Sequence, residues 1–398
     1  MADDILIIGV DGGASKVRAH EIILKKDVFA LGSHKAVKEY KNYSEFQTDF
    51  IPVDLKMQLS EIQSHSIKLT EQELAQSKAY YSAFIDTINE IVTSSEFDKV
   101  LIGIGLPGIK TADGRGIIAM ANGPRMPNFS IELEKRLSKV GINLVQPIAK
   151  LGSDADYCGI GEEYAEQGSF RNSKNAYYLG GGTGAADALK LRGTLISFDH
   201  CHNWLAKTWE FKSKAGKTME TYCSANGIQS IYSEISGVPQ NELNMQKVYL
   251  EQILYRAYSG DANGENTWEI VTENLALLLY ERISTIYSGY QNLFEFIDPN
   301  HSDLQNDHEY LGTLLDKIII GQRLGDLFKN KVAHEIIINP LLSKLTDLLM
   351  SDNLLDEKAK SHYIKRHQFN SNILITSNLR SAPVLGAGID AWNSYVSI

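Results

Sequence analysis

Two short glycine-rich turns, far apart in the chain, contain the residues best suited to chemistry. The first is Asp11-Gly12-Gly13-Ala14-Ser15-Lys16, and the second is Gly180-Gly181-Gly182-Thr183-Gly184. Each follows an apolar run. Glycines leave backbone N–H groups uncovered by side chains, so several donors can hold one anion. Two such turns in one chain predict that it binds phosphate groups.

Each turn is expected to join two strands of a hairpin. Residues 5–10 and 17–24 have strand patterns around the first turn, and residues 175–179 and 186–191 around the second. A P-loop needs a following helix and a Gly-Lys-Ser/Thr ending, and the dinucleotide-binding fingerprint also opens a helix. The hairpins exclude both motifs.

The remaining elements complete two α/β halves. Hydrophobic spacing predicts helices at 71–95, 130–140, 243–256, 268–296, 324–350 and 387–395, and strands at 99–105, 143–148, 317–321 and 372–376. A mixed sheet with helices on both faces, made twice, is the expected architecture, with a ligand in the cleft between the halves. We expect domains at 1–150 and 151–386, with the last helix, 387–398, packing back on the first. Residues 40–70 and about 300–312 are expected insertions.

Composition narrows the class of protein. The 398 residues are 43% hydrophobic and 22% charged, as in a globular protein with two domains. The net charge of −10 argues against a nucleic-acid-binding surface. The acidic start lacks a secretory signal, and no apolar run approaches the ~20 residues of a membrane span. We therefore expect a cytoplasmic protein with no membrane partner.

The order of motifs resembles the sugar kinases of the ROK family, within the actin-like ATPase (ribonuclease H-like) superfold, over nearly the whole chain. The motifs that carry the resemblance are Asp11–Lys16, Gly103–Gly108, Asn122-Gly123-Pro124, Ser153-Asp154-Ala155-Asp156, Gly182-Thr183-Gly184, Gly216–Glu220, Ile318–Gly325 and Leu385–Gly388. The resemblance implies an ATP-dependent and Mg²⁺-dependent kinase that phosphorylates a hexose or amino sugar, most simply at C6 as a glucokinase does. It also suggests a homodimer.

The same resemblance assigns residues to roles. Asp154 is the expected catalytic base, and Asp11 the expected Mg²⁺ ligand, directly or through water. The expected nucleotide-binding residues are Asp11, Gly12, Gly13, Lys16, Gly182, Thr183, Gly184, Gly321 and Gly386. The expected sugar-binding residues are Gly108, Asn122, Ser153, Glu210 and Glu220.

The chain also departs from the family pattern. The family's zinc module, a His followed by three Cys, is missing, because Ser213 stands at the His position and no Cys lies between 201 and 223. A closed zinc site needs four N or S ligands, so structural zinc is not expected. Ser153 replaces an Asn of the family, and Gln322 replaces a Gly.

Each assignment has a simpler alternative. Asp11 is also a common turn former, and Asp154 could cap the helix that follows. Lys16 on a hairpin strand is often only solvated, and Glu210 and Glu220 could each be an ordinary exposed helical residue. The segment Asp199-His200-Cys201-His202 invites a metal site, but on a strand only alternate residues share a face.

Two other functions compete with the kinase. One is a non-catalytic sugar or nucleotide sensor, since the family includes repressors with a DNA-binding helix-turn-helix ahead of the first hairpin. Ten residues precede Asp11, so we expect no such reader domain here. The other is an ATPase of the same superfold with a non-sugar substrate.

Overall fold

The computed structural model describes residues 4–26 and 28–397, which divide into two compact units. The first unit comprises Met1–Gln167 and Ser381–Ile398, and the second comprises Gly168–Arg380. This division leaves residues 151–167 with the first unit, whereas the sequence analysis placed them in the second domain. Among the described residues, no helix is long and apolar enough to cross a membrane.

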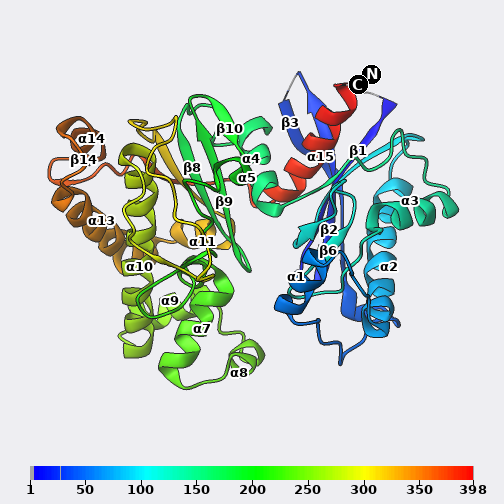
Figure 1. Cartoon of the computed structure of the whole chain (residues 1–398), viewed down its shortest axis with the longest axis horizontal. Helices are drawn as coiled ribbons and strands as arrows, with labels where there is room; N and C mark the ends of the chain where they lie inside the picture. The colour runs from blue at the N-terminus through cyan, green and yellow to red at the C-terminus, as the bar shows by residue number, and fades with distance from the viewer. Residues whose placement is uncertain (1–3, 27, 398) are drawn as a thin grey trace. The chain divides into compact units, whose positions relative to one another are not determined.

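The first unit is built on a five-stranded mixed sheet (Figure 1). The strand order is β3-β2-β1-β4-β7, with β1 antiparallel to β2 and parallel to β4. The strands are β1 (Leu6–Gly12), β2 (Lys16–Lys25), β3 (Val28–Glu39), β4 (Val100–Gly105) and β7 (Leu151–Gly152), with the small hairpin β5 (Ile109–Lys110) and β6 (Ile117–Ala119). The helices are η2 (Tyr40–Asn42), α1 (Leu55–Gln63), α2 (Glu71–Thr93), α3 (Phe129–Lys139), α4 (Asp154–Tyr164) and α15 (Ala382–Val396).

Helices cover both faces of this sheet. On one face, α2 packs on β2 and β3, α3 packs on α2, and their apolar side chains form one core with those of β1 and β4. On the other face lie α15 and α4. The approach of α15 is close, because a Cβ on Gly9 would lie 1.9 Å from the Val384 carbonyl oxygen. A Cβ on Gly103 would lie 1.8 Å from the Ala387 carbonyl oxygen. Glycines in β1 and β4 are therefore what allow α15 to pack directly on the sheet.

The second unit repeats the plan of the first. Its sheet has the order β10-β9-β8-β13-β16, again with a hairpin at the centre and parallel strands beyond it. The strands of this sheet are β8 (Ala176–Gly181), β9 (Ala185–Leu191), β10 (Thr194–Ile196), β13 (Lys317–Gly321) and β16 (Leu374–Thr376). Two separate two-stranded ribbons pair β11 (Phe211–Lys212) with β12 (Glu295–Phe296), and β14 (Ile364–Lys365) with β15 (Gln368–Phe369). The sequence-based expectation of a mixed sheet made twice is confirmed.

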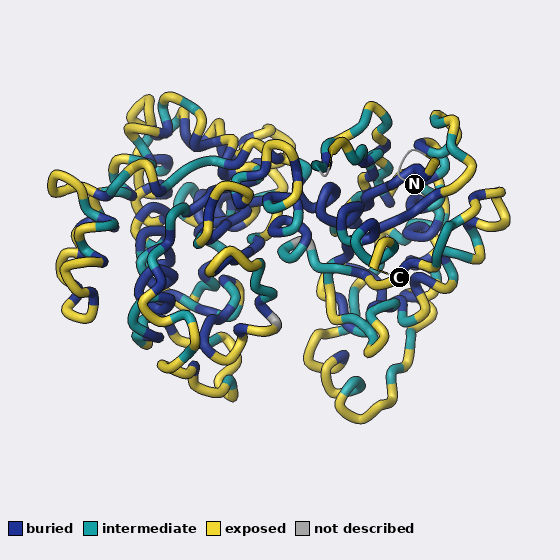
Figure 2. The backbone as a smooth tube through the Cα atoms, turned by 90° about the horizontal axis from the view of Figure 1, so that it is seen from above, coloured by how far each residue is buried: buried dark blue, intermediate teal, exposed yellow. Residues whose placement is uncertain are grey.

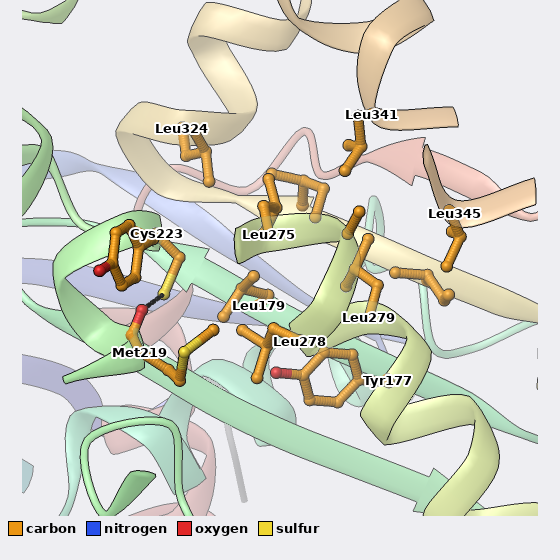
Figure 3. Close-up of a cluster of buried hydrophobic side chains, with 14 of the residues drawn as sticks. Tyr177, Leu179, Met219, Cys223, Leu275, Leu278, Leu279, Leu324, Leu341 and Leu345 are labelled. Carbon is orange, nitrogen blue, oxygen red and sulfur yellow. Dashed lines mark hydrogen bonds between the residues drawn. The ribbon is translucent and has the colours of Figure 1, made fainter. Parts of the chain in front are cut away.

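The helices of the second unit are α5 (Phe198–Cys201), α6 (Met219–Cys223), α7 (Ala225–Ser236), α8 (Gln240–Met245), α9 (Leu250–Tyr258), α10 (Ala262–Ser288), α11 (Gln322–Phe328), α12 (Lys331–Ala333), the π-helix η3 (His334–Ile338), α13 (Asn339–Ser351) and α14 (Glu357–Tyr363). Among them, α10 is buried along most of its length and packs against α6, α7, α9, η3 and α13. Figure 3 shows Leu275, Leu278 and Leu279 of α10 packed among β8, α6, α11 and α13. The central strands β1, β4, β8 and β13 are buried along almost their whole length, and Figure 2 shows buried segments in the interior of each unit.

Several expected elements differ in the structure. Residues 143–148 form no strand and make only a bridge between Leu144 and Val100, since Pro147 cannot donate to a ladder. The expected helix at 243–256 is broken between α8 and α9, where Lys247 has φ of +56°. The expected helix at 268–296 begins earlier and ends at Ser288, because Gly289 has φ of +89°.

Three further segments also differ. The expected helix at 324–350 is divided into α11, α12, η3 and α13, and Asn330 caps α12. Residues 198–201 form α5, so the strand argument applied to the His200 segment was wrong. The expected insertion at 40–70 contains η2 and α1, whereas residues 300–312 contain no helix or strand.

Candidate active site

The first glycine turn is a tight hairpin whose tip is Ala14-Ser15. Gly12 lies in β1 opposite Val17, and the Gly13 N–H donates to the Lys16 carbonyl oxygen at 2.9 Å. A Cβ on Gly12 would lie 2.5 Å from side-chain carbons of Leu106 and Phe84. The N–H groups of Ala14 and Ser15 make no hydrogen bond with the described part of the chain. Gly12 is therefore required by the close packing at this hairpin, while the open N–H donors of the turn belong to Ala14 and Ser15.

Two stacked tyrosines hold this tip in place. The rings of Tyr40 and Tyr80 lie 3.8 Å apart, and the Tyr80 hydroxyl donates to the Ala14 carbonyl oxygen at 3.3 Å. The Tyr40 backbone N–H donates to the Ser15 carbonyl oxygen at 3.1 Å. Burial, with the neighbouring Tyr80 and Asp11, raises the pKa of Tyr40 well above its ordinary value. The phenol thus stays neutral beside Asp11.

Asp11 and Lys16 flank the turn on its two strands. Asp11 lies near the end of β1 and is half-buried, and Lys16 opens β2 opposite Glu39. Mg²⁺ prefers one or two carboxylates and completes its shell with water and phosphate oxygens, so a carboxylate beside an open tip fits this ion. Among the described residues, no group of three or more His, Cys, Asp or Glu side chains is placed to hold a metal. The position of Asp11 therefore fits a Mg²⁺ ion whose other ligands are mainly phosphate oxygens and water.

The expected sugar-side residues of the first unit lie at the ends of β4 and β6. Gly108 has φ of +101°, and a Cβ there would lie 2.3 Å from the Ala119 carbonyl oxygen, so the turn after β4 requires glycine. Asn122 follows β6, is exposed, and makes no hydrogen bond with the described part of the chain. Its side-chain amide is therefore free for a ligand.

Ser153, and not Asp154, caps α4. The Ser153 hydroxyl accepts from the Asp156 N–H at 3.0 Å and donates to the Asp156 carboxylate at 2.8 Å. Asp154 is the first residue of α4 and follows Ser153, which comes directly after the end of β7. The side chain of Asp154 lies outside the described part of the structure. Capping by another residue removes the simplest alternative role for this aspartate.

Asp390 of α15 is an acidic residue next to α4 whose pKa is shifted. Its carboxylate lies 3.4 Å from the Tyr157 hydroxyl and 3.7 Å from the Lys150 ammonium. Burial raises the pKa of Asp390, and Lys150 only partly offsets it. Gly386, one turn earlier, is buried, and a Cβ there would lie 2.0 Å from the Tyr157 carbonyl oxygen. This close packing of α15 on α4 explains why residue 386 is a glycine, and the explanation does not require a bound ligand.

In the second unit, side chains from two other elements border the second glycine turn. The Glu220 carboxylate, from α6, accepts from the Ala185 N–H at 2.8 Å, directly after the turn. A Cβ on Gly182 would lie 1.9 Å from the Gln322 side-chain oxygen, and one on Gly184 would lie 2.6 Å from Glu220. Glu220, expected to bind sugar, is thus part of the support of this turn.

A pocket opens beside the second turn, entirely within the second unit. Its volume is about 580 Å³, within the ~300–1,000 Å³ usual for small-molecule sites. Thr183 is the lining residue that the sequence analysis had named. The others come from α7, α8, α9, α11, the segments next to these helices and the segment after β16: Ala225, Asn226, Gln229, Asn244, Tyr249, Leu250, Glu251, Arg323, Asp326, Leu327, Asn330 and Arg380.

Glu210 and Gly321, two other residues predicted to bind ligands, both lie close to other parts of the second unit. The Glu210 carboxylate accepts from the Lys207 N–H at 2.5 Å and closes a turn, so this residue lies in no helix. A Cβ on Gly321, at the end of β13, would lie 2.1 Å from the Tyr178 hydroxyl oxygen. The segment that carries Glu210 is held by aromatic packing of Phe211 on Tyr290 and by a 2.8 Å hydrogen bond between Ser213 and Tyr222.

A buried charge network lies behind the second turn. Asp187 of β9 accepts from the hydroxyls of Tyr177 and Thr208, each at 2.5 Å. Arg282 of α10 lies 3.4 Å from Asp187 and 2.8 Å from Glu281, and all three side chains are almost fully buried. Burial raises the pKa of Glu281, although Arg282 opposes this. The network ties β9 to α10 and to the segment before β11.

Comparisons with known proteins identify the family. A model of the ROK family matches residues 56–288, more than half of the chain, so the chain belongs to this family. A search of the curated proteins finds no matching sequence.

Solved structures of this family share the fold at low sequence identity. A ROK family glucokinase from Streptomyces griseus, solved with glucose and AMPPNP, has a TM-score of 0.57 at 13% identity, with 98% of this chain and 99% of that chain covered. The ROK hexokinase of Thermus thermophilus has a TM-score of 0.52 at 14% identity, with 98% and 99% covered. A ROK family transcriptional regulator, a homologue of the E. coli MLC protein, has a TM-score of 0.54 at 13% identity, with 99% of this chain and 79% of that chain covered. The fold is therefore the actin-like ATPase fold of the ROK sugar kinases.

Proposed function

We propose that the chain is an ATP-dependent sugar kinase that transfers the γ-phosphate to a hydroxyl of a hexose or amino sugar, at C6 as in glucokinases. The observation that carries the proposal is the pocket of about 580 Å³ beside Thr183 in a chain of the ROK family. Such a volume suits a nucleoside, and the turn beside it suits phosphates.

The nucleotide pocket offers mixed chemistry. Leu250 and Leu327 provide apolar surface, and Asn226, Gln229 and Asn244 provide amide groups. The Gln229 amide donates to the Asn244 side-chain oxygen at 3.0 Å and to the Val248 carbonyl at 2.8 Å, so its orientation is set before a ligand binds. A preorganised polar wall costs less ordering on binding. We assign this pocket to the nucleoside and the turn at Gly182-Thr183-Gly184 to its phosphates.

The first unit supplies the acceptor-side chemistry in this proposal. Asn122 binds sugar hydroxyls, and Asp154 takes the proton from the attacking hydroxyl. The open N–H groups of Ala14 and Ser15 bind phosphate oxygens, with Lys16 beside them. Asp11 would hold Mg²⁺, which when bound neutralises charge on the phosphate oxygens. Phosphoryl transfer needs mainly positioning and charge stabilisation, which these groups supply.

The test is a coupled ADP-release assay with Mg²⁺-ATP over a panel of hexoses and amino sugars. We expect saturable turnover with at least one of them. Nucleotide binding without turnover on any sugar would contradict the proposal and favour a sensor, the role suggested by the structural match to a ROK transcriptional regulator. Turnover limited to acceptors that are not sugars would instead indicate an ATPase or kinase with another substrate.

A further inference from the structure

Asn122 lies on a loop that follows β6. The loop comprises residues 120–125, and Met126 closes it by exchanging two 2.9 Å backbone hydrogen bonds with Ile117. Asn122 itself is exposed and has no hydrogen-bonding partner in the described part of the chain. A loop that presents a side chain to a ligand binds more tightly when its conformation is set in advance.

Gln58 of α1 holds the first residue of this loop. Its side chain is fully buried, and its amide donates to the Met120 carbonyl oxygen at 3.1 Å. The Met120 N–H donates in return to the Gln58 side-chain oxygen at 2.8 Å. One side chain therefore satisfies both peptide groups of Met120, as a neighbouring strand would.

Arg125 anchors the other end of the loop. Its guanidinium is fully buried and makes two hydrogen bonds, of 2.6 and 2.8 Å, with the Glu73 carboxylate of α2. It also donates to the Glu61 carboxylate of α1 and, at 2.8 Å, to the Lys68 carbonyl oxygen. Bidentate Arg–carboxylate pairs are strong and geometrically specific, so the position of Arg125 is closely defined.

The orientation of α1 shows that polar contacts determine its position. The helix buries Gln58, while Leu55, Met57 and Leu59 are 42%, 59% and 38% exposed. With about 3.6 residues per turn, Leu55 and Leu59 share one face of the helix and Met57 lies on the opposite face, and a helix placed by hydrophobic burial would turn one of these faces inward. Its buried side instead carries the groups that bind the loop.

We propose that Gln58, Glu61, Glu73 and Arg125 form a loop clamp, a set of positioning residues that holds Asn122 ready for the acceptor. The inference rests on the proposed function, because it takes the Asn122 loop as the acceptor-binding wall. The clamp makes residues 55–68 a working part of the acceptor site. It sets acceptor affinity and leaves nucleotide affinity alone.

The test variant is Gln58→Leu, which removes both hydrogen bonds to Met120, together with the 2.6 Å hydrogen bond of the same amide to the Val53 carbonyl oxygen, and keeps the side-chain size. We expect the KM for the sugar to rise about tenfold, the factor that corresponds to about 1.4 kcal/mol of lost preorganisation, with the KM for ATP unchanged. Hydrogen exchange of the peptide that spans 117–126 should accelerate, while that of the β1–β2 hairpin stays as in the native protein.

The matched control is Glu21→Gln. Glu21 of β2 binds the Ser33 N–H and the His34 ring of β3, and these contacts do not involve residues 120–125. This variant should lower stability without a change in the KM for the sugar. If Gln58→Leu does not fold, Glu61→Gln, which weakens the charge contact with Arg125 and keeps an acceptor oxygen, takes its place.

Two results would overturn the clamp. One is an unchanged KM for the sugar together with unchanged exchange over 117–126, and the other is an equal KM change in Glu21→Gln. The exchange measurement does not depend on catalysis. If the native protein phosphorylates no sugar, the proposed function fails, while slow loop exchange that accelerates in Gln58→Leu still supports the clamp.

Discussion

Replacement of Arg282 by methionine tests how the second unit holds the strand that follows its glycine turn. The guanidinium is fully buried, lies 2.8 Å from Glu281 and 3.4 Å from Asp187, and stands over the Tyr177 ring at 5.5 Å. Methionine fills much of the same volume, so the electrostatic loss dominates. Two buried carboxylates then lose their cation, which costs about 3–5 kcal/mol. That is a large part of the roughly 5–15 kcal/mol that stabilises an ordinary protein.

The assay is urea unfolding at pH 7 with linear extrapolation of the free energy of unfolding. Since burial raises the pKa of Glu281, adding Glu281→Gln removes a charge that the core disfavours, and the double variant should regain part of the loss. A loss below about 1 kcal/mol in Arg282→Met, as for an exposed ion pair, would refute this reasoning. So would a double variant that is less stable than the single one.

Three further predictions address other parts of the chain. Asp154→Ala should lower kcat about 10²–10⁴-fold with ATP affinity unchanged by calorimetry, and near-normal turnover would remove Asp154 from the mechanism. Gly103→Ala places a Cβ 1.8 Å from the Ala387 carbonyl oxygen and should lower the free energy of unfolding by about 1–3 kcal/mol, so an unchanged thermal midpoint would contradict the close helix packing. Burial raises the pKa of Asp390 above its ordinary 3.8, so between pH 3.8 and the raised pKa the folded protein holds one proton more than the unfolded chain. The free energy of unfolding should therefore fall as the pH rises through this range. Asp390→Asn should remove this pH dependence from unfolding curves, and an unchanged dependence on pH in the variant would contradict the prediction.

Local patterns allowed the two hairpins to be predicted from the sequence. Strand alternation around Gly12-Gly13 and around Gly182 depends on neighbouring residues, and both hairpins lie where they were expected. The repeat of the sheet followed from recognising the same unit twice. The strand predicted at residues 143–148 was wrong because Pro147 interrupts an apolar run that otherwise has the pattern of a strand.

The nucleotide pocket could not be predicted in the same way. Its lining residues are spread from Thr183 to Arg380 and meet only through the packing of α7, α8, α9 and α11. The partners of Glu210 and Glu220 are also tertiary or turn contacts that no spacing rule reveals. One signal was available, since Arg323 belongs to the quoted Ile318–Gly325 motif, next to Gln322 at a family glycine position.

As a sugar kinase, this chain would move the γ-phosphate of ATP to a sugar hydroxyl, and this transfer can be followed with labelled ATP. The most direct measurement incubates the protein with Mg²⁺ and γ-labelled ATP in the presence of the hexose and amino-sugar panel, and follows the label by chromatography and mass spectrometry. We expect the label on the hydroxyl of at least one sugar, in an amount equal to the ADP released. Label recovered only as inorganic phosphate, or retained in ATP with every sugar, would contradict this expectation.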